Sequence, residues 1–277
     1  MNDRTFITSQ VRVMQEQEQT EAYRCNDYLG YRTEFGPEDR QALCTWGYRM
    51  IKAFTGINRL TVVRAISYFD RYMSTSHQGR EQQVETIQLA FISSLIIALK
   101  IDSGLKVDLD FFALVVTRDA YGEEEIRRME LKILHALQWR LSGPSPHDFI
   151  ERFLEMIPRM EARHIGFLHR FSKAVAEVAI TRYSIALQYP SVIAFSAICC
   201  GLEYLESIDE IHNLRIRGSL QSISGLSCTD PFFKSVIESM VHIVLEIFSN
   251  DDLPGQGGTD NSSVSSEDSP TSIFHAP

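Results

Sequence analysis

Residue types that often carry catalysis or metal binding are present in this chain, but their spacing fits neither chemistry. Among the five cysteines, the one close pair is Cys199 and Cys200, and adjacency is a poor geometry for a disulfide. His164 and His169 are five positions apart, whereas two metal ligands on one helix face are four apart. The sequence has no CxxC, GxSxG or P-loop string. We therefore expect a chain that is not an enzyme, holds no metal or cofactor, and keeps its thiols reduced.

Four charged residues that border apolar stretches are better candidates for a functional role. Lys100 ends an apolar run over 89–99, and Glu130 lies on a segment with an apolar face. Taken from the residues alone, an internal salt bridge at a bundle rim is the simpler interpretation of these two, worth about 0–1 kcal/mol if exposed. Arg40 and Asp70 are each flanked by apolar residues, which makes two solvated surface charges the weaker interpretation.

The elements that must position these residues show helical periodicity throughout, with few Pro or Gly breaks. Before the breaker at 143–146 the pattern predicts helices over about 8–24, 37–55, 61–73, 89–100, 110–116 and 123–137. After it, the pattern predicts helices over 147–156, 162–179, 190–205, 210–219 and 231–248. The predicted fold class is all-α.

Two of these segments, 89–100 and 191–202, are apolar on nearly every side, which is typical of a helix surrounded by others. They lie about 100 residues apart, so the sequence favours two tandem five-helix bundles, with one larger bundle as the alternative. The expected domains are an N-terminal helical extension over 1–36, bundles over 37–142 and 146–250, and a disordered tail over 251–277.

The charge of the chain is concentrated at one end. The net charge is −9, and the Ser-, Pro- and acid-rich tail carries five acidic residues with no Lys or Arg. This balance argues against a nucleic-acid binder, which normally shows a basic footprint. The apolar run over 89–99 is interrupted by Ser93 and Ser94 and is too short to span a bilayer. The polar first residues lack a signal core, so we expect no membrane partner and no export.

Several strings, in order, resemble the cyclin family over about residues 37–250. The strings are RQALCTW at 40–46, YFDRYMS at 68–74, QL at 88–89 with LIIALK at 95–100, EEIRRME at 124–130 and PSPHDFI at 144–150. The last of these is nearest to D-type cyclins. The resemblance implies a cyclin box followed by a second cyclin fold.

Five positions that recur in the cyclin box fall on Arg40, Asp70, Leu89, Lys100 and Glu130. The resemblance implies that Arg40 and Asp70 form a structural ion pair, and that Lys100 and Glu130 contact the partner kinase beside its movable C-helix. It also implies a set of apolar contacts to the kinase. The residues that would make them are Ile97, Ile101, Leu134, Trp139 and Leu141. For two of these residues, Ile97 and Leu134, packing in the core of the chain is a close alternative.

By this resemblance the chain is a regulatory subunit that binds and activates a cyclin-dependent serine/threonine kinase by holding its C-helix in the active position. A role in cell-cycle control is favoured, with the nucleus and cytoplasm as the expected locations. The alternatives are a transcription-associated cyclin, a tandem cyclin-fold scaffold of the transcription machinery, and an unrelated helical adaptor.

The family's substrate-docking patch is matched here by Leu43, Trp46 and Gln88. Asp39 and Arg49 stand at neighbouring positions where the family has other residue types, which alters the charge of the patch. Phosphorylation substrates are therefore expected partners with an altered mode of docking.

Two further motifs bear on partners. Tyr23, Cys25 and Asp27 have the spacing of an LxCxE motif for retinoblastoma-type proteins but different end residues, which makes chance the simpler explanation. The tail resembles a degradation signal, with Ser266 in an acidic phosphosite and Ser269 before a proline. This pattern suggests ubiquitin-ligase machinery as a further partner.

Overall fold

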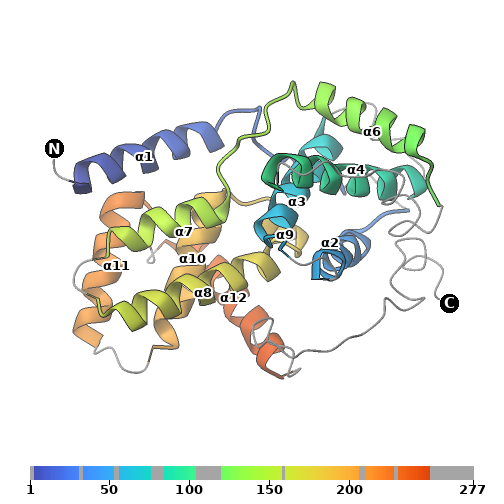
Figure 1. Ribbon diagram of the computed structural model, residues 1–277. Helices are drawn as coiled ribbons and strands as arrows, with labels where there is room; N and C mark the ends of the chain where they lie inside the picture. The colour runs from blue at the N-terminus through green and yellow to red at the C-terminus, as the bar shows by residue number, and fades with distance from the viewer. Residues whose placement is uncertain are drawn as a thin grey trace. The chain divides into compact units, whose positions relative to one another are not determined.

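The computed structural model describes residues 3–30, 34–52, 56–75, 84–103, 120–157, 160–205, 210–227 and 230–249 (Figure 1). Within these ranges every regular element is a helix and no strand occurs. The described residues separate into two compact units, one built from those within 24–142 and the other from those up to residue 23 together with those within 143–249. The all-α fold class and its tandem arrangement are confirmed.

The N-terminal unit contains four described helices: α2 (Pro37–Lys52), α3 (Leu60–Ser74), α4 (Val84–Ser103) and α6 (Glu123–Ala136). Helix α4 packs against α2, α3 and α6, and its residues 87–99 are all buried. Even Ser93 and Ser94 are fully buried, and the Ser94 hydroxyl donates to the Ala90 carbonyl 2.8 Å away. The uniformly apolar run thus marks the central helix of the unit, as the pattern predicted.

Local signals define where these helices begin. At the start of α2 the Gly36 N–H donates to the Asp39 carboxylate at 2.8 Å, and at the start of α6 the Gly122 N–H donates to Glu125 at 2.9 Å. Both acids lie in the first helical turn, where they also face the positive end of the helix dipole. The register of α6, and so the position of Glu130, is set in part by this cap.

The C-terminal unit has the same plan around a second central helix. It contains α7 (Pro146–Glu155), α8 (Ala162–Ala179), α9 (Tyr183–Ala186), α10 (Pro190–Glu203), α11 (Glu210–Ser224) and α12 (Pro231–Ser249). Every residue of α10 over 191–202 is buried, and α7, α8, α11 and α12 all contact it. The four-residue α9 was not expected, because one turn is too short to show helical periodicity.

Helix α1 (Asp3–Glu18) belongs to this second unit, although it comes first in the chain. It runs alongside α7 and also contacts α11 (Figure 1). The Gln15 amide donates to the Ser224 carbonyl at 2.7 Å, and the buried Glu18 carboxylate accepts from Ser191 at the start of α10. The structure therefore divides the N-terminal extension: its helix packs with the C-terminal bundle, and residues 24–30 and 34–36 belong with the N-terminal one.

Two parts of the expected organisation lie outside the described residues. They are the predicted helix over 110–116 and the tail over 251–277, including Ser266 and Ser269.

Candidate interaction surface

The end of α4 meets the middle of α6 through one ion pair. Lys100 Nζ lies 2.7 Å from Oε1 and 2.8 Å from Oε2 of Glu130. Only 9% of the Glu130 side chain is exposed, compared with 39% of the Lys100 side chain. An ammonium group carries three donors and a carboxylate about four acceptor positions, so this contact uses only part of the capacity of each group. The pair is internal to the chain, yet its ammonium is partly open to solvent.

Large apolar side chains stand exposed on, and just past the end of, the two helices that form this ion pair. Ile101, which follows Lys100 on α4, is 47% exposed, and Leu131, which follows Glu130 on α6, is 51% exposed. Trp139, just past the end of α6, is 59% exposed. An exposed tryptophan with aliphatic neighbours is the composition of a protein-binding surface core. We call Lys100, Ile101, Glu130, Leu131 and Trp139 the α4–α6 surface.

Leu131 was missed by the sequence reasoning. It lies outside the apolar face that α6 turns toward α4. An apolar residue at a position expected to face solvent was the sequence signal that could have identified it. Leu131 is three residues from Leu134, and residues three apart are neighbours on a helix surface. Leu134 and Leu141 are half-buried, so each has part of its side chain open to a partner.

Ile97 differs from the other predicted contacts because it is only 4% exposed. It faces the interior of the N-terminal unit, as the core-packing alternative held. A partner would find little of this side chain to touch.

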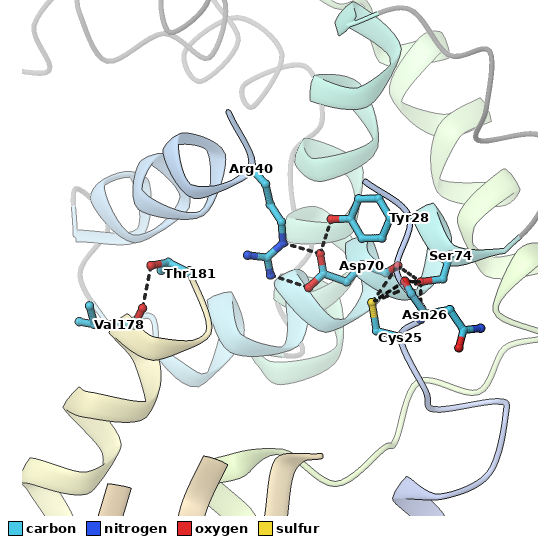
Figure 2. Close-up of polar contacts among 8 residues, drawn as sticks. All are labelled: Cys25, Asn26, Tyr28, Arg40, Asp70, Ser74, Val178 and Thr181. Atoms are coloured by element: carbon cyan, nitrogen blue, oxygen red, sulfur yellow. Dashed lines mark hydrogen bonds and ion pairs between the residues drawn. The ribbon is translucent and has the colours of Figure 1, made fainter. Parts of the chain in front are cut away.

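Arg40 and Asp70 form a buried ion pair between α2 and α3 (Figure 2). Arg40 Nε donates to Oδ1 of Asp70 at 2.8 Å and Nη2 donates to Oδ2 at 2.6 Å. The Tyr28 hydroxyl donates to the same Oδ1 at 2.7 Å, so the carboxylate has three donors. Burial opposes the charge on Arg40, but the Asp70 carboxylate holds the Arg40 pKa well above its usual value. Burial, and then the charge of Asp70, raise the Tyr28 pKa well above its usual value.

The residues that match a substrate-docking patch lie in the core of the N-terminal unit. Leu43 is 0%, Trp46 is 2% and Gln88 is 3% exposed. The Trp46 ring packs edge-on against Phe91, and Gln88 accepts a hydrogen bond from the Tyr121 hydroxyl at 3.0 Å. In this structure the three side chains offer little surface to a substrate, and docking at this place stays a prediction.

Cys25, the centre of the LxCxE-like spacing, is held against α3 (Figure 2). Its Sγ lies 3.3 Å from the Ser74 hydroxyl and 3.7 Å from the Asp70 carbonyl. Burial raises the pKa of the thiol to about 12, and the charge of Asp70 adds to this rise. A partner could take this segment as a docking peptide only by displacing it from α3.

Two further kinds of feature, a metal site and a membrane span, are absent from the described residues. They contain no group of three or more His, Cys, Asp or Glu side chains that could hold a metal ion. No helix among them is both long and apolar enough to cross a membrane.

Two family models match the chain, one in each half. Residues 10–142 match the family model "Cyclin, N-terminal domain", and residues 144–251 match "Cyclin, C-terminal domain". The chain belongs to the cyclin family. Cyclins are regulatory subunits and are not enzymes themselves, in agreement with the expectation from the motifs.

Individual relatives of this cyclin come from several branches of the family. "G2/mitotic-specific cyclin-2" of Antirrhinum majus is 28% identical over 212 residues, 74% of this chain and 45% of the relative. "Cyclin-D3-2" of Arabidopsis thaliana is 28% identical over 176 residues, 62% of this chain and 46% of the relative. The chain thus spans less than half the length of these curated relatives.

A solved structure shares the fold. The viral cyclin from herpesvirus saimiri superposes with a TM-score of 0.68 at 18% identity, over 89% of this chain and all of the viral one. The tandem arrangement of cyclin folds in this chain is therefore the family's own.

Proposed function

We propose that this cyclin is a regulatory subunit that binds a cyclin-dependent protein kinase through the α4–α6 surface and holds the kinase's C-helix in its active position. The observation that carries the proposal is the exposure of Ile101, Leu131 and Trp139 on, and just past the end of, the two helices that form the partly open Lys100–Glu130 pair. A group of large exposed apolar side chains rimmed by charged residues is a common mark of a protein-binding site.

The physical requirement on such a surface is modest. A kinase is active only when its Lys–Glu pair and its Mg²⁺-binding Asp are placed together, and the position of the C-helix controls this. A rigid helical bundle that binds only the active arrangement shifts the population toward it. Moving that equilibrium from 1:99 to 99:1 takes about 5.5 kcal/mol of differential affinity. A tryptophan anchor with aliphatic neighbours and a few charged hydrogen bonds is of the right order.

The test is to purify associated proteins with the wild-type chain and with a double variant that combines Lys100→Glu and Glu130→Lys. Because Lys100 and Glu130 contact each other, the double exchange keeps an internal ion pair while it reverses both charges toward a partner. We expect a cyclin-dependent kinase with the wild type and at least a tenfold loss of that kinase with the double variant.

The matched control exchanges Glu124 and Arg128, which form an exposed ion pair on α6, the helix that carries Glu130. This control should recover as much kinase as the wild type. Equal recovery with the Lys100/Glu130 exchange would show that these charges are not the anchor. Absence of any kinase with the wild type would overturn the proposed function.

We extend the proposal to cell-cycle control, with residence in the nucleus and cytoplasm. The support is the D-type-like string at 144–150 and the mitotic name of the Antirrhinum relative. Chain abundance followed through a synchronised cell population tests this extension, and a constant level would count against it. Binding of phosphorylation substrates and ubiquitin-ligase machinery belongs to the same proposal.

A further inference from the structure

The backbone just past α6 adopts an uncommon conformation at two successive residues. Gln138 has φ 52° and Trp139 has φ 59°, both in the left-handed region that favours glycine. A side chain at such a position costs about 1–2 kcal/mol relative to a right-handed one. Two such residues in a row persist only where the surrounding structure holds them.

The first set of restraints comes from α6 itself. The Gln138 N–H donates to the His135 carbonyl at 3.0 Å, and the Trp139 N–H donates to the Leu134 carbonyl at 2.9 Å. These two bonds are the pattern of a Schellman motif, in which a left-handed residue closes the last helical turn and is usually glycine. The His135 and Trp139 rings also meet edge to face, with centroids 6.2 Å apart. The helix end thus directs Trp139 back over its own last turn.

The second set of restraints comes from α3. Arg71 Nη2 donates to the Arg140 carbonyl at 2.7 Å, and the Tyr68 hydroxyl donates to the Leu141 carbonyl at 3.1 Å. Both donors come from well-buried residues, Arg71 at 3% and Tyr68 at 2% exposed. Two buried side chains, one of them charged, are therefore directed at the backbone that leaves the turn. Trp139 itself remains 59% exposed between the two sets of restraints.

We infer that the left-handed turn at Gln138 and Trp139, held by Arg71 and Tyr68, fixes Trp139 in its binding orientation before the kinase arrives. This inference rests on the proposed function. Arg71 and Tyr68 are positioning residues: they lie behind the α4–α6 surface and act on a partner only through the turn. An anchor that is already ordered loses less conformational entropy on binding, so the same contact yields a tighter complex.

The turn can be tested at an exposed position that touches no core. Gln138→Val puts a β-branched residue where φ is positive, a conformation such residues rarely adopt, whereas Gln138→Gly leaves that φ freely accessible. The two variants remove the same exposed side chain and differ in how well they tolerate the turn. Tyr68→Phe, which removes one hydroxyl, tests the α3 side of the device.

The first readout is taken on the free chain. The protein has two tryptophans, Trp46 and Trp139, so 5-fluorotryptophan labelling gives two fluorine NMR signals. The signal that disappears in Trp139→Phe is that of Trp139. We expect the Trp139 signal to shift or broaden in Gln138→Val and Tyr68→Phe and to stay near its original place in Gln138→Gly. The signal of the buried Trp46 should remain unchanged in all three and reports that the fold is intact.

The second readout is the affinity for the cyclin-dependent kinase that co-purifies with the wild-type chain, re-expressed as a pure protein. Gln138→Val should bind it about tenfold more weakly than Gln138→Gly, the ratio that corresponds to the cost of the backbone conformation. An unchanged Trp139 signal in Gln138→Val, or a changed signal with unchanged affinity, would overturn the inference. Neither result contradicts the proposed function. The proposed function is contradicted only if the wild-type chain binds no kinase.

Discussion

At the scale of single residues, the buried carboxylate of Asp70 connects two helices and a loop of the N-terminal unit. It accepts hydrogen bonds from Arg40 and from Tyr28, which lies outside the helices. A buried ion pair adds little net stability, because desolvation offsets the attraction, but removing one partner leaves an uncompensated charge in the interior. The pair therefore fixes how α2 and α3 meet more than it strengthens their contact.

Replacing Asp70 by Asn should lower the free energy of unfolding by about 3–5 kcal/mol, because the Arg40 guanidinium stays buried without its counter-charge. Tyr28→Phe is the graded control: it removes one hydrogen bond to a charged group and should cost about 1–3 kcal/mol. Urea denaturation of the two variants measures both losses. A smaller loss for Asp70→Asn than for Tyr28→Phe would contradict the assignment.

At the scale of elements, α1 is attached to the C-terminal bundle by a titrating group. The Glu18 carboxylate accepts from the Ser191 N–H at 2.9 Å and from the Ser191 hydroxyl at 2.5 Å, at the first turn of α10. Burial raises the pKa of Glu18 to about 7, even though the hydrogen bonds from Ser191 lower it. The attachment of α1 therefore responds to pH near neutrality.

The sign of that response follows from linkage. An acid whose pKa is higher in the folded chain than its ordinary value of 4.5 binds its proton more tightly when folded. Its contribution to stability is complete below about pH 4.5 and is lost as the pH rises through about 7. Between pH 5 and pH 8 the free energy of unfolding of the wild type, relative to Glu18→Gln, should fall by roughly 1–3 kcal/mol.

Denaturation curves at several pH values give this difference directly. Glu16→Gln, which changes an exposed acid on the same helix, serves as the matched control and should run parallel to the wild type. Parallel curves for Glu18→Gln and the wild type would show that Glu18 does not titrate in this range.

At the scale of the whole molecule, the net charge is unevenly distributed along the chain. More than half of the net charge of −9 comes from residues 251–277, which contain five acids and no Lys or Arg. The overall acidity therefore says little about the α4–α6 surface. We propose that it bears instead on how the chain is modified and removed.

Deleting residues 251–277 should lengthen the half-life of the chain at least twofold, because the segment combines acids with the candidate phosphosites Ser266 and Ser269. The measurement is decay of the chain after protein synthesis is blocked. A double variant, Ser266→Ala with Ser269→Ala, separates phosphorylation from tail composition. Identical decay of the full and shortened chains would remove the tail as a degradation signal.

How much the sequence could predict is clearest from particular elements. The central helices α4 and α10 were readable because a helix-length segment that is apolar on nearly every side is typical of a helix surrounded by others. The Arg40–Asp70 pair was predicted from the resemblance to the cyclin family, because two of the positions that recur in the cyclin box fall on these residues. Both signals are local, and local patterns are what a sequence displays directly.

The tertiary structure alone decided two kinds of feature. One is contact between residues far apart in the chain, and the other is a backbone conformation that the residue type disfavours. That α1 packs with the C-terminal bundle depends on Glu18 reaching Ser191, a contact that no periodicity encodes. Trp139 is reached through a left-handed turn that begins at Gln138. Glutamine does not favour that conformation, so its residue type does not predict the turn. Buried donors from α3 hold that turn, so its conformation is a property of the folded unit. The sequence by itself determined the helical fold class, the two central helices and the family, and packing determined which side chains the helices leave open to a partner.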